Sequence, residues 1–304
     1  MNPQSNPTKT AVLLLAHGSP DSADDVPEFL LRVTGGRPLP AEVVAEVTQR
    51  YGLIGRSPLT ALTMEQGELL ARELGLPVYV GMRNWKPLIA DTLRTMAADQ
   101  IERVVAICLA PQNSRTSVGL YRAAITGNSV RFAIDFVEAW HDHPLLIEAF
   151  SQKLTAGRRR AGLEMQAKVP VIFTAHSVPQ RTITQGDPYE SQAKDTAALV
   201  ARGASLAPED WTFAFQSQGM AGGAWLGPTV EDTILELKTK GHRGVFVQPI
   251  GFLCDHVEVL YDIDIGFKQF AAREGMSLWR ADSLNDSPLL TAALADLARS
   301  RWKK

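Results

Sequence analysis

The chain has 304 residues, about twice the length of a common single domain, so one large domain or two modest ones are expected. Hydrophobic residues make up 45% and charged residues 21%, which is typical of globular proteins and excludes the collagen-like, disordered and disulfide-scaffold classes. Lysine and arginine number 31 against 33 aspartate and glutamate, a net charge of -2. No overall field therefore attracts nucleic acid or an anionic membrane.

Six short apolar runs, each closed by turn residues, predict buried strands. In chain order they are residues 11–16, 77–81, 103–110, 169–175, 211–217 and 244–251. Helix-length segments lie between them: Pro58 begins one that ends at Gly75, and Pro228 begins another that ends at Gly241. Strands that alternate with helices indicate parallel βαβ units in an open sheet with helices on both faces.

The order of motifs repeats once along the chain. The first predicted strand runs into AHGSP at residues 16–20, and the fourth runs into AHSVP at residues 175–179. We therefore predict two similar α/β domains that meet between residues 140 and 162. Because parallel sheets bind ligands beyond the carboxyl ends of their strands, both segments should face a shared cleft. No GxGxxG or GxxxxGK[ST] motif follows a strand, which argues against a nucleotide ligand.

The two cysteines, Cys108 and Cys254, lie far apart, each inside an apolar run. We expect buried thiols that pack as small hydrophobes, and neither a cysteine-bound zinc ion nor an iron–sulfur cluster. The N-terminal residues are polar and do not resemble a signal peptide, and the apolar runs are shorter than the roughly 20 residues of a membrane span. These features predict a soluble, cytoplasmic protein with no stable membrane insertion.

Two segments carry residues suited to chemistry. His176 follows an apolar strand, where it either caps the strand end or faces a ligand. In DHVEVLYD at residues 255–262, Asp255 and Glu258 have the spacing of a capping box, but Glu258 and Asp262 also share one helix face. Such carboxylates repel each other, and a bound cation would relieve the cost. His176 and Glu258 could hold a metal ion between imidazole and carboxylate, with positions left open for a substrate.

The motifs in this order resemble those of the ferrochelatases, which insert ferrous iron into a porphyrin in haem biosynthesis. The resemblance covers nearly the whole chain and is carried by LLLAHGSP, YGLIGRSPL, VGMRNWKPLI, LAPQNSRTSVGLY, FTAHSVPQRTITQGDPY, FAFQSQG, WLGPTVEDTI and PIGFLCDHVEVLYDIDI. It implies two Rossmann-like domains around a porphyrin cleft, each a parallel sheet flanked by helices. We place them at residues 1–150 and 151–304, the second carrying the metal-site residues.

The resemblance also implies roles for single residues. His176 and Glu258 match the metal-site pair of the family, and Asp262 continues the carboxylate row. The residues that match the porphyrin pocket, or border it as candidate partners of the porphyrin carboxylates, are His17, Arg50, Tyr51, Ser57, Arg115, Tyr121 and Arg122. For Arg115 and Arg122 the alternative is a solvated helix end.

Three positions depart from the family's pattern. Many bacterial relatives have tyrosine where this chain has His17, and histidine where it has Asn84. An acidic residue expected eight positions after Glu258 is here Gly266. The carboxylate row on this segment is therefore shorter than in the family and ends at Asp262 or Asp264.

Metal insertion needs little covalent chemistry. The enzyme must bend the porphyrin, remove two pyrrole protons and desolvate the cation. His176 is the expected general base, with Glu258 holding its orientation and charge. The expected partners are a porphyrin and ferrous iron, both substrates, with no cofactor, no nucleic acid and a monomeric chain. The alternatives are a cobalt or nickel chelatase acting on a related tetrapyrrole and a porphyrin carrier without turnover.

The choice of porphyrin rests on two opposing features. LAPQNSRTSVGLY resembles ferrochelatases that use coproporphyrin more than those that use protoporphyrin. Coproporphyrin III carries four propionates and protoporphyrin IX two, so the former needs more cationic partners, for which Arg37, Arg50, Arg56, Arg115 and Arg122 are candidates. Against this, residues 34–36 are TGG where the family has a basic stretch. On balance the sequence favours coproporphyrin III.

Overall fold

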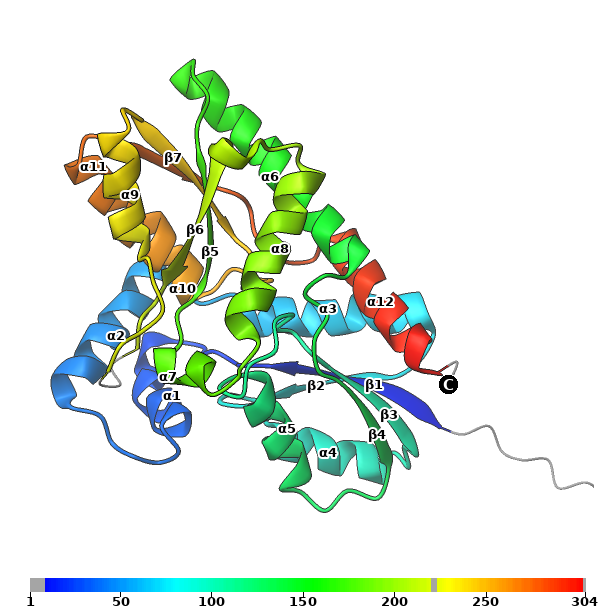
Figure 1. The fold of residues 1–304 in the computed structure, drawn as a ribbon. Helices are drawn as coiled ribbons and strands as arrows, with labels where there is room; N and C mark the ends of the chain where they lie inside the picture. The colour runs from blue at the N-terminus through cyan, green and yellow to red at the C-terminus, as the bar shows by residue number, and fades with distance from the viewer. Residues whose placement is uncertain (1–8, 220–222, 303–304) are drawn as a thin grey trace, which may run out of the picture.

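The computed structural model describes residues 9–219 and 223–302. They form two four-stranded parallel sheets of the same order, β2-β1-β3-β4 and β6-β5-β7-β8 (Figure 1). The strands are β1 (Thr10–Ala16), β2 (Val78–Met82), β3 (Arg103–Cys108), β4 (Ala133–Val137), β5 (Val171–His176), β6 (Trp211–Gln216), β7 (Gly244–Pro249) and β8 (Ser277–Arg280). The identical order confirms the internal repeat and the predicted α/β class.

The six predicted strands are all present, whereas β4 and β8 were not predicted. Both lie at the edge of their sheet, where a strand is paired on one side only. β4 reads AIDFV with its first four residues exposed or half-buried, and β8 reads SLWR over four residues. An edge strand buries fewer side chains, and these two sequences lack a continuous apolar run of the kind that identifies a buried parallel strand. The other two edge strands, β2 and β6, were predicted because their runs are more apolar.

The two helices predicted to begin at prolines are present, with bounds that differ slightly from the prediction. Pro58 is the N-cap of α3 (Leu59–Leu74), and Gly75 ends that helix with φ +66°, in the left-handed region that favours glycine. α9 (Val230–Thr239) begins after Pro228, because the Thr229 hydroxyl accepts a hydrogen bond from the backbone N–H of Asp232. Both helices thus lie where expected, within a residue or two.

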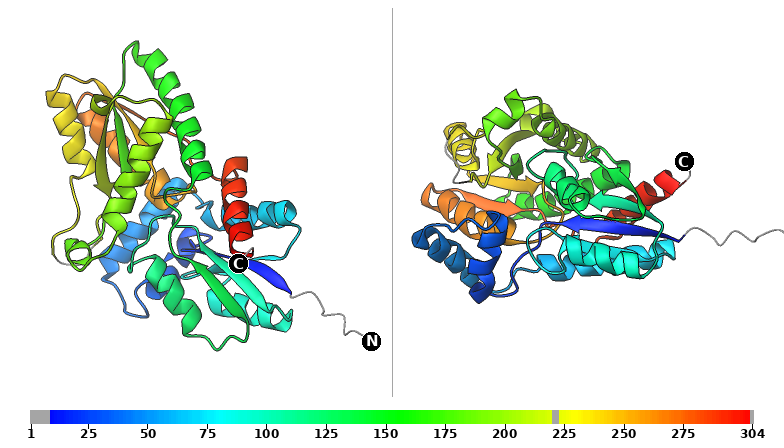
Figure 2. Two further views of the ribbon diagram at one scale, coloured as in Figure 1. Left: turned by 45° about the vertical axis from the view of Figure 1, so that its right-hand side comes forward. Right: turned by 90° about the horizontal axis from the view of Figure 1, so that it is seen from below.

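Most of the remaining helices cover the faces of the two sheets, whereas the first two helices of the chain pack on each other (Figures 1 and 2). They are α1 (Val26–Val33), α2 (Ala41–Ile54), α4 (Ile89–Ala98), α5 (Val118–Thr126), α6 (Pro144–Met165), α7 (Gln180–Thr184), α8 (Tyr189–Gly203), α10 (Val257–Leu260), α11 (Lys268–Arg273) and α12 (Pro288–Trp302). A π-helical turn, Asp262–Phe267, joins α10 to α11. Among the described residues, no helix is both long and apolar enough to cross a membrane.

The two sheets are joined by more than one chain crossing. The predicted boundary at residue 150 falls inside α6, which leads from the first sheet to the second. The last helix, α12, then returns to pack on α3 and α6 (Figure 1). Its Arg301 pairs with Asp135 of β4, Nη1 to Oδ1, at 3.1 Å, and its backbone carbonyl accepts a hydrogen bond from Arg103. The C-terminal helix therefore fastens the two sheets together.

The carboxyl ends of the two sheets face each other and are linked by buried polar contacts. Gln112, after β3, donates its side-chain N–H to the Thr196 hydroxyl (3.1 Å) and to the Ile250 carbonyl (3.2 Å) in the second sheet's half of the molecule. α2 packs against α10 across the same junction. Because β5 and β7 are neighbours, the segments that follow them emerge side by side toward the first domain.

Candidate active site between the two domains

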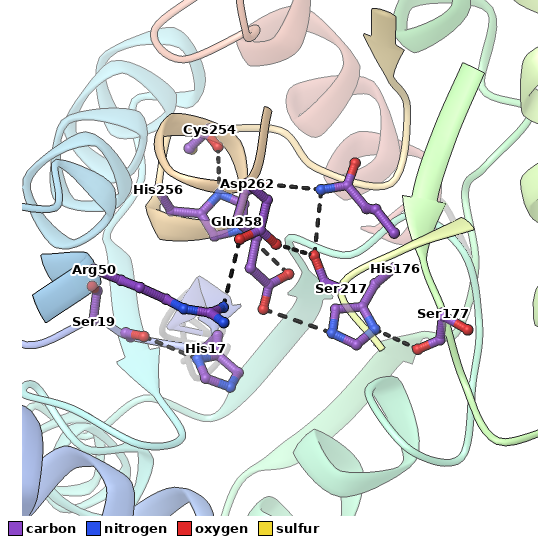
Figure 3. Close-up of polar contacts among 12 residues, drawn as sticks. His17, Ser19, Arg50, His176, Ser177, Ser217, Cys254, His256, Glu258 and Asp262 are labelled. Carbon is purple, nitrogen blue, oxygen red and sulfur yellow. Dashed lines mark hydrogen bonds and ion pairs between the residues drawn. The ribbon is translucent and has the colours of Figure 1, made fainter. Parts of the chain in front are cut away.

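His176 is the last residue of β5, and its ring is held in one orientation. Its Nδ1 is hydrogen-bonded to the carbonyl oxygen of Ser177. A carbonyl only accepts, so Nδ1 carries the hydrogen and Nε2 keeps its lone pair. The Nε2 atom lies 3.7 Å from Oε1 of Glu258 (Figure 3). The Tyr189 hydroxyl donates to the His176 carbonyl at 2.9 Å, which anchors the backbone. His176 thus presents a basic nitrogen to a carboxylate.

Glu258 lies on α10 between two imidazoles. Its Oε2 is 3.8 Å from Nε2 of His256, on the side away from His176. Gln216, at the end of β6, donates to the Glu258 carbonyl at 2.8 Å and so fixes the backbone. Burial by itself would raise the pKa of Glu258, but the adjacent imidazole of His176 and then the hydrogen bond from His256 lower it to about 2. Glu258 is therefore a carboxylate at neutral pH and a poor proton acceptor.

His256 is a site residue that the sequence analysis quoted but gave no role. Its Nδ1 donates to the Cys254 carbonyl at 2.9 Å, and its ring packs edge-on against Phe252 at 4.7 Å between centroids. Burial acts to lower the pKa of His256, yet the Glu258 carboxylate and the Cys254 carbonyl raise it overall. The one available signal was its position directly before the short helix that carries Glu258.

The capping-box alternative for Asp255 and Glu258 is wrong. The N-cap of α10 is His256, and it makes no side-chain capping hydrogen bond. The Asp255 carboxylate instead accepts hydrogen bonds from Ser283 (2.7 Å) and Asn285 (2.9 Å). Glu258 is therefore not engaged in capping its own helix, and its carboxylate is available to the site.

Asp262 lies at the start of the π-helical turn, next to residues from both domains. Its carboxylate accepts a hydrogen bond from the Ser217 hydroxyl, and its Oδ1 is 3.8 Å from Nη1 of Arg50 on α2 (Figure 3). Arg50 also lies over the Tyr261 ring at 5.1 Å. Burial is the main cause that raises the pKa of Asp262 to about 6, and the nearby Glu258 carboxylate adds to this effect. The hydrogen bond from Ser217 and the charge of Arg50 act in the opposite direction. The carboxylates of Glu258 and Asp262 therefore lie close to each other, as predicted, and they repel each other.

This repulsion has a measurable effect on stability. A carboxyl group whose folded pKa is about 6 and whose ordinary value is 3.8 destabilises the fold increasingly as pH rises through that interval. We therefore expect Asp262→Asn to increase the free energy of unfolding by about 2 kcal/mol above pH 6, and by almost nothing below pH 4. Urea unfolding of both proteins from pH 3.5 to 8 measures this difference. A difference that is independent of pH would contradict the assigned pKa.

His17 follows β1 as His176 follows β5, but it is bound differently. Its Nδ1 donates to the Gly18 carbonyl (3.0 Å), and its Nε2 accepts from the side-chain amide of Asn84 (2.9 Å). The residue is exposed to solvent, but the protein around the ring disfavours its charged form. This desolvation, together with the positive charge of Arg83, lowers the pKa of His17 to about 4. His17 is therefore neutral with both nitrogens engaged. Of the two repeated histidines, His176 has the nitrogen free to act.

Tyr51 and Ser57 are both buried. The Tyr51 hydroxyl is 3.3 Å from the Ser19 hydroxyl, its ring packs edge-on against Phe29, and burial raises the pKa of Tyr51 to about 12. The Ser57 hydroxyl has no hydrogen-bond partner within the described ranges. In those ranges, no hydrogen bond or ion pair joins either residue to His176 or Glu258. Their predicted roles along the porphyrin stay predictions.

The two predicted arginines that follow β3, Arg115 in the loop and Arg122 on α5, already bind protein groups. The backbone N–H of Arg115 donates to Asp187 at 2.7 Å, and its guanidinium donates to Gln185 and the Thr182 carbonyl, which ties this loop to α7. Arg122 pairs with Glu138 and lies over the Phe136 ring at 4.5 Å. The geometry therefore gives Arg115 a contact between domains and Arg122 a surface ion pair, and binding of porphyrin carboxylates by either stays a prediction.

Arg83 is a second residue that sequence reasoning missed. It lines a pocket of about 580 Å³ whose walls also include Leu31, Ile89 and Asn128. Its guanidinium lies 5.5 Å from the centre of the Tyr121 ring, and its Nη1 is buried without a hydrogen-bond partner among the described residues. A buried N–H without an acceptor is costly, so the site favours an anionic group that would accept from it. Arg83 follows β2, so the strand-end rule applied to the histidines would have found it.

The structure contains no preformed metal cage among the residues it describes. In residues 9–219 and 223–302, no three His, Cys, Asp or Glu side chains are grouped so that they could hold a metal ion. His176 and Glu258 form a pair of possible ligands whose separation leaves room for a further ligand. Such an open pair suits a metal that is handed on to a substrate.

Comparison with known proteins places the chain in one family. The sequence model of the family described as Ferrochelatase matches residues 9–302. A ferrochelatase of Acidobacterium capsulatum is 56% identical over 96% of this chain and 94% of that protein. A coproporphyrin III ferrochelatase of Geobacillus sp. (strain WCH70) is 33% identical over 97% of this chain and 98% of that protein.

The fold has relatives among solved structures. The sirohydrochlorin chelatase SirB from Bacillus subtilis subspecies spizizenii, in complex with cobalt, matches with a TM-score of 0.57 over 96% of this chain and 94% of that chain. At 11% identity this is a likeness of fold alone. The family match over nearly the whole chain and the curated relatives together show that the chain belongs to the ferrochelatases, metal chelatases of the lyase class.

Proposed function

We propose that this ferrochelatase inserts ferrous iron into coproporphyrin III in haem biosynthesis, with His176 as the base and Glu258 as the charge that supports it. The observation that carries the proposal is the pairing of the free His176 Nε2 with the Glu258 carboxylate at 3.7 Å. The porphyrin loses two pyrrole protons as iron enters, so a base and a counter-charge are needed on one side of the ring.

The two side chains divide the work according to their charge. A carboxylate whose pKa is about 2 binds protons poorly, so Glu258 is not the acceptor. An imidazole with a free Nε2 accepts one pyrrole proton, and the neighbouring carboxylate stabilises the imidazolium that forms. The His176 side chain is 36% exposed, so it can pass that proton to water and accept the second. Glu258 and His176 can also contact the incoming iron before it enters the ring.

Coproporphyrin III is favoured because arginine side chains lie near the site, where they could bind propionates. Arg83 has a buried nitrogen without an acceptor, beside Tyr121. Arg50, half-buried on α2, faces the same junction between the domains. The relatives named coproporphyrin III ferrochelatase support the same choice.

Activity with each porphyrin tests the proposal directly. The protein is mixed anaerobically with Fe²⁺ and an excess of either porphyrin, and the absorbance of the metallated product is followed. We expect many turnovers, and a higher kcat/KM with coproporphyrin III. A spectral change that stops at one equivalent of protein would support the carrier alternative. Faster insertion of Co²⁺ or Ni²⁺ into a related tetrapyrrole would support the other chelatase. A preference for protoporphyrin IX would overturn the choice of substrate.

The arginine that meets the porphyrin carboxylates can be identified by paired variants. We expect Arg83→Gln to weaken coproporphyrin III binding about 10-fold at low salt, protoporphyrin IX binding less, and both by smaller factors as salt rises. Arg122→Gln should change either Kd by less than about 2-fold, because Arg122 forms an exposed ion pair. Fluorescence titration measures both constants. A larger effect of Arg122→Gln would restore the sequence-based assignment and remove Arg83 from the site.

We also propose that the protein acts as a monomer and needs no resident cofactor. The proposed steps use only protein side chains and the two substrates, and both cysteines are buried as free thiols. Sedimentation of the purified protein, together with metal and sulfide analysis, tests both statements. The cytoplasmic location stays a prediction.

A further inference from the structure

Glu258 lies on a helix of only four residues, so its position depends on what holds the chain on either side of it. A single turn has almost no stability of its own, because nucleating a helix is unfavourable. Upstream is the loop after β7, which contains Asp255, and downstream is the π-helical turn, which contains Asp264. Besides the Gln216 hydrogen bond to the Glu258 carbonyl, the contacts made by these two carboxylates therefore help to set where Glu258 lies.

One guanidinium binds both carboxylates. Arg280, the last residue of β8, donates to Asp264 from Nε (2.8 Å) and from Nη2 (2.9 Å). The same Nη2 is 3.2 Å from Oδ1 of Asp255. The Arg280 side chain is 14% exposed and that of Asp255 21%, so this pair is largely shielded from water, whereas Asp264 is 39% exposed. Asp255 is further held by Asn285 through its backbone N–H and its carboxylate, both at 2.9 Å.

The same network reaches the first domain. Gln66, on α3, donates to the Asn285 carbonyl at 2.6 Å, and the same amide nitrogen lies 3.1 Å from Sγ of Cys254. The loop that leads to Glu258 is thus tied to β8 and to the opposite domain. No hydrogen bond or ion pair among the described residues joins Arg280 to His176 or Glu258.

We propose that Arg280 is a positioning residue for the iron-insertion step: by binding Asp255 and Asp264 on opposite sides of Glu258, it sets the separation of Glu258 from His176. The inference rests on the proposed function, because it assigns Arg280 an effect on the His176–Glu258 pair that the proposed function depends on. Displacement of a reacting group by about 1 Å can cost on the order of 100-fold in rate. Residues that orient metal ligands typically affect activity by about 10- to 100-fold.

Arg280→Lys tests the proposal, because an ammonium keeps the charge but cannot form the planar fork that spans two carboxylates. We expect kcat to fall by about 10- to 100-fold while the porphyrin Kd changes by less than about 3-fold. The matched control is Arg158→Lys on α6, away from the site. It alters a partly buried ion pair between Arg158 and Asp210. It should lower the melting temperature comparably and leave kcat unchanged.

A second variant keeps the test decisive if Arg280→Lys does not fold. Asp264→Asn removes one partner and should lower kcat with an unchanged porphyrin Kd; combined with Arg280→Lys, it should add little to the loss. Retention of more than half of wild-type kcat by the folded variant, or an equal loss in the control, overturns the inference. Wild-type protein is measured in parallel: if it inserts no iron the proposed function fails, whereas active wild type with an unaffected variant refutes only the role of Arg280.

Discussion

Replacing His176 by alanine should lower kcat for iron insertion by about 100- to 10,000-fold, the usual loss when a positioned base is removed. Porphyrin binding should stay within several-fold of wild type, because the large apolar face of the macrocycle supplies affinity and the imidazole supplies proton transfer. Anaerobic turnover and a fluorescence titration of the porphyrin measure the two quantities separately. A large loss of kcat with nearly unchanged porphyrin binding would assign His176 to the chemical step.

The control for this prediction is His143→Ala. The Nε2 atom of His143 is hydrogen-bonded to Oδ2 of Asp296 at 3.1 Å, and no hydrogen bond or ion pair among the described residues joins His143 to His176 or Glu258, so this variant should leave turnover unchanged. If His176→Ala keeps more than a tenth of wild-type turnover, the base must be sought elsewhere. His17 is not the first substitute to test, because both of its ring nitrogens already have partners.

Glu258→Gln should be nearly as damaging as His176→Ala. Glutamine has nearly the shape of glutamate but no charge, so an imidazolium formed at His176 loses its counter-charge, and His256 loses its anionic partner. The double variant should lose only a few-fold more than either single variant, because residues that act as one unit are not additive. Turnover of the three variants, with porphyrin Kd as the second measurement, tests this.

A matched glutamate outside the site provides the comparison. Glu46→Gln removes an exposed partner of Arg50 on α2 and should change turnover far less than Glu258→Gln. Additive losses in the double variant would show that His176 and Glu258 act in separate steps. Full activity of Glu258→Gln would show that the charge between the two histidines is not needed for insertion.

The main site residues were accessible to sequence reasoning because they obey simple rules. His176 and Glu258 follow neighbouring strands of a parallel sheet, and the ends of such strands meet at one edge. The arginines were harder to assign, since an arginine beyond a strand either binds a ligand or pairs with protein. Arg115 and Arg122 proved to have protein partners, whereas Arg83 has a buried nitrogen without one within the described ranges. Sequence spacing does not distinguish these cases.

The sequence by itself determined the repeat of two parallel α/β units, six of the eight strands and the His176–Glu258 pair. These features depend on local apolar runs, on turn residues and on the order of motifs, all of which are encoded over short distances. Only the tertiary structure decided the state of each polar group: His17 tied to Asn84, His256 behind Glu258, and Arg280 across Asp255 and Asp264. The first and third of these join separate segments of the chain, and in all three the burial and charge around each group come from the packing of the two domains and their loops.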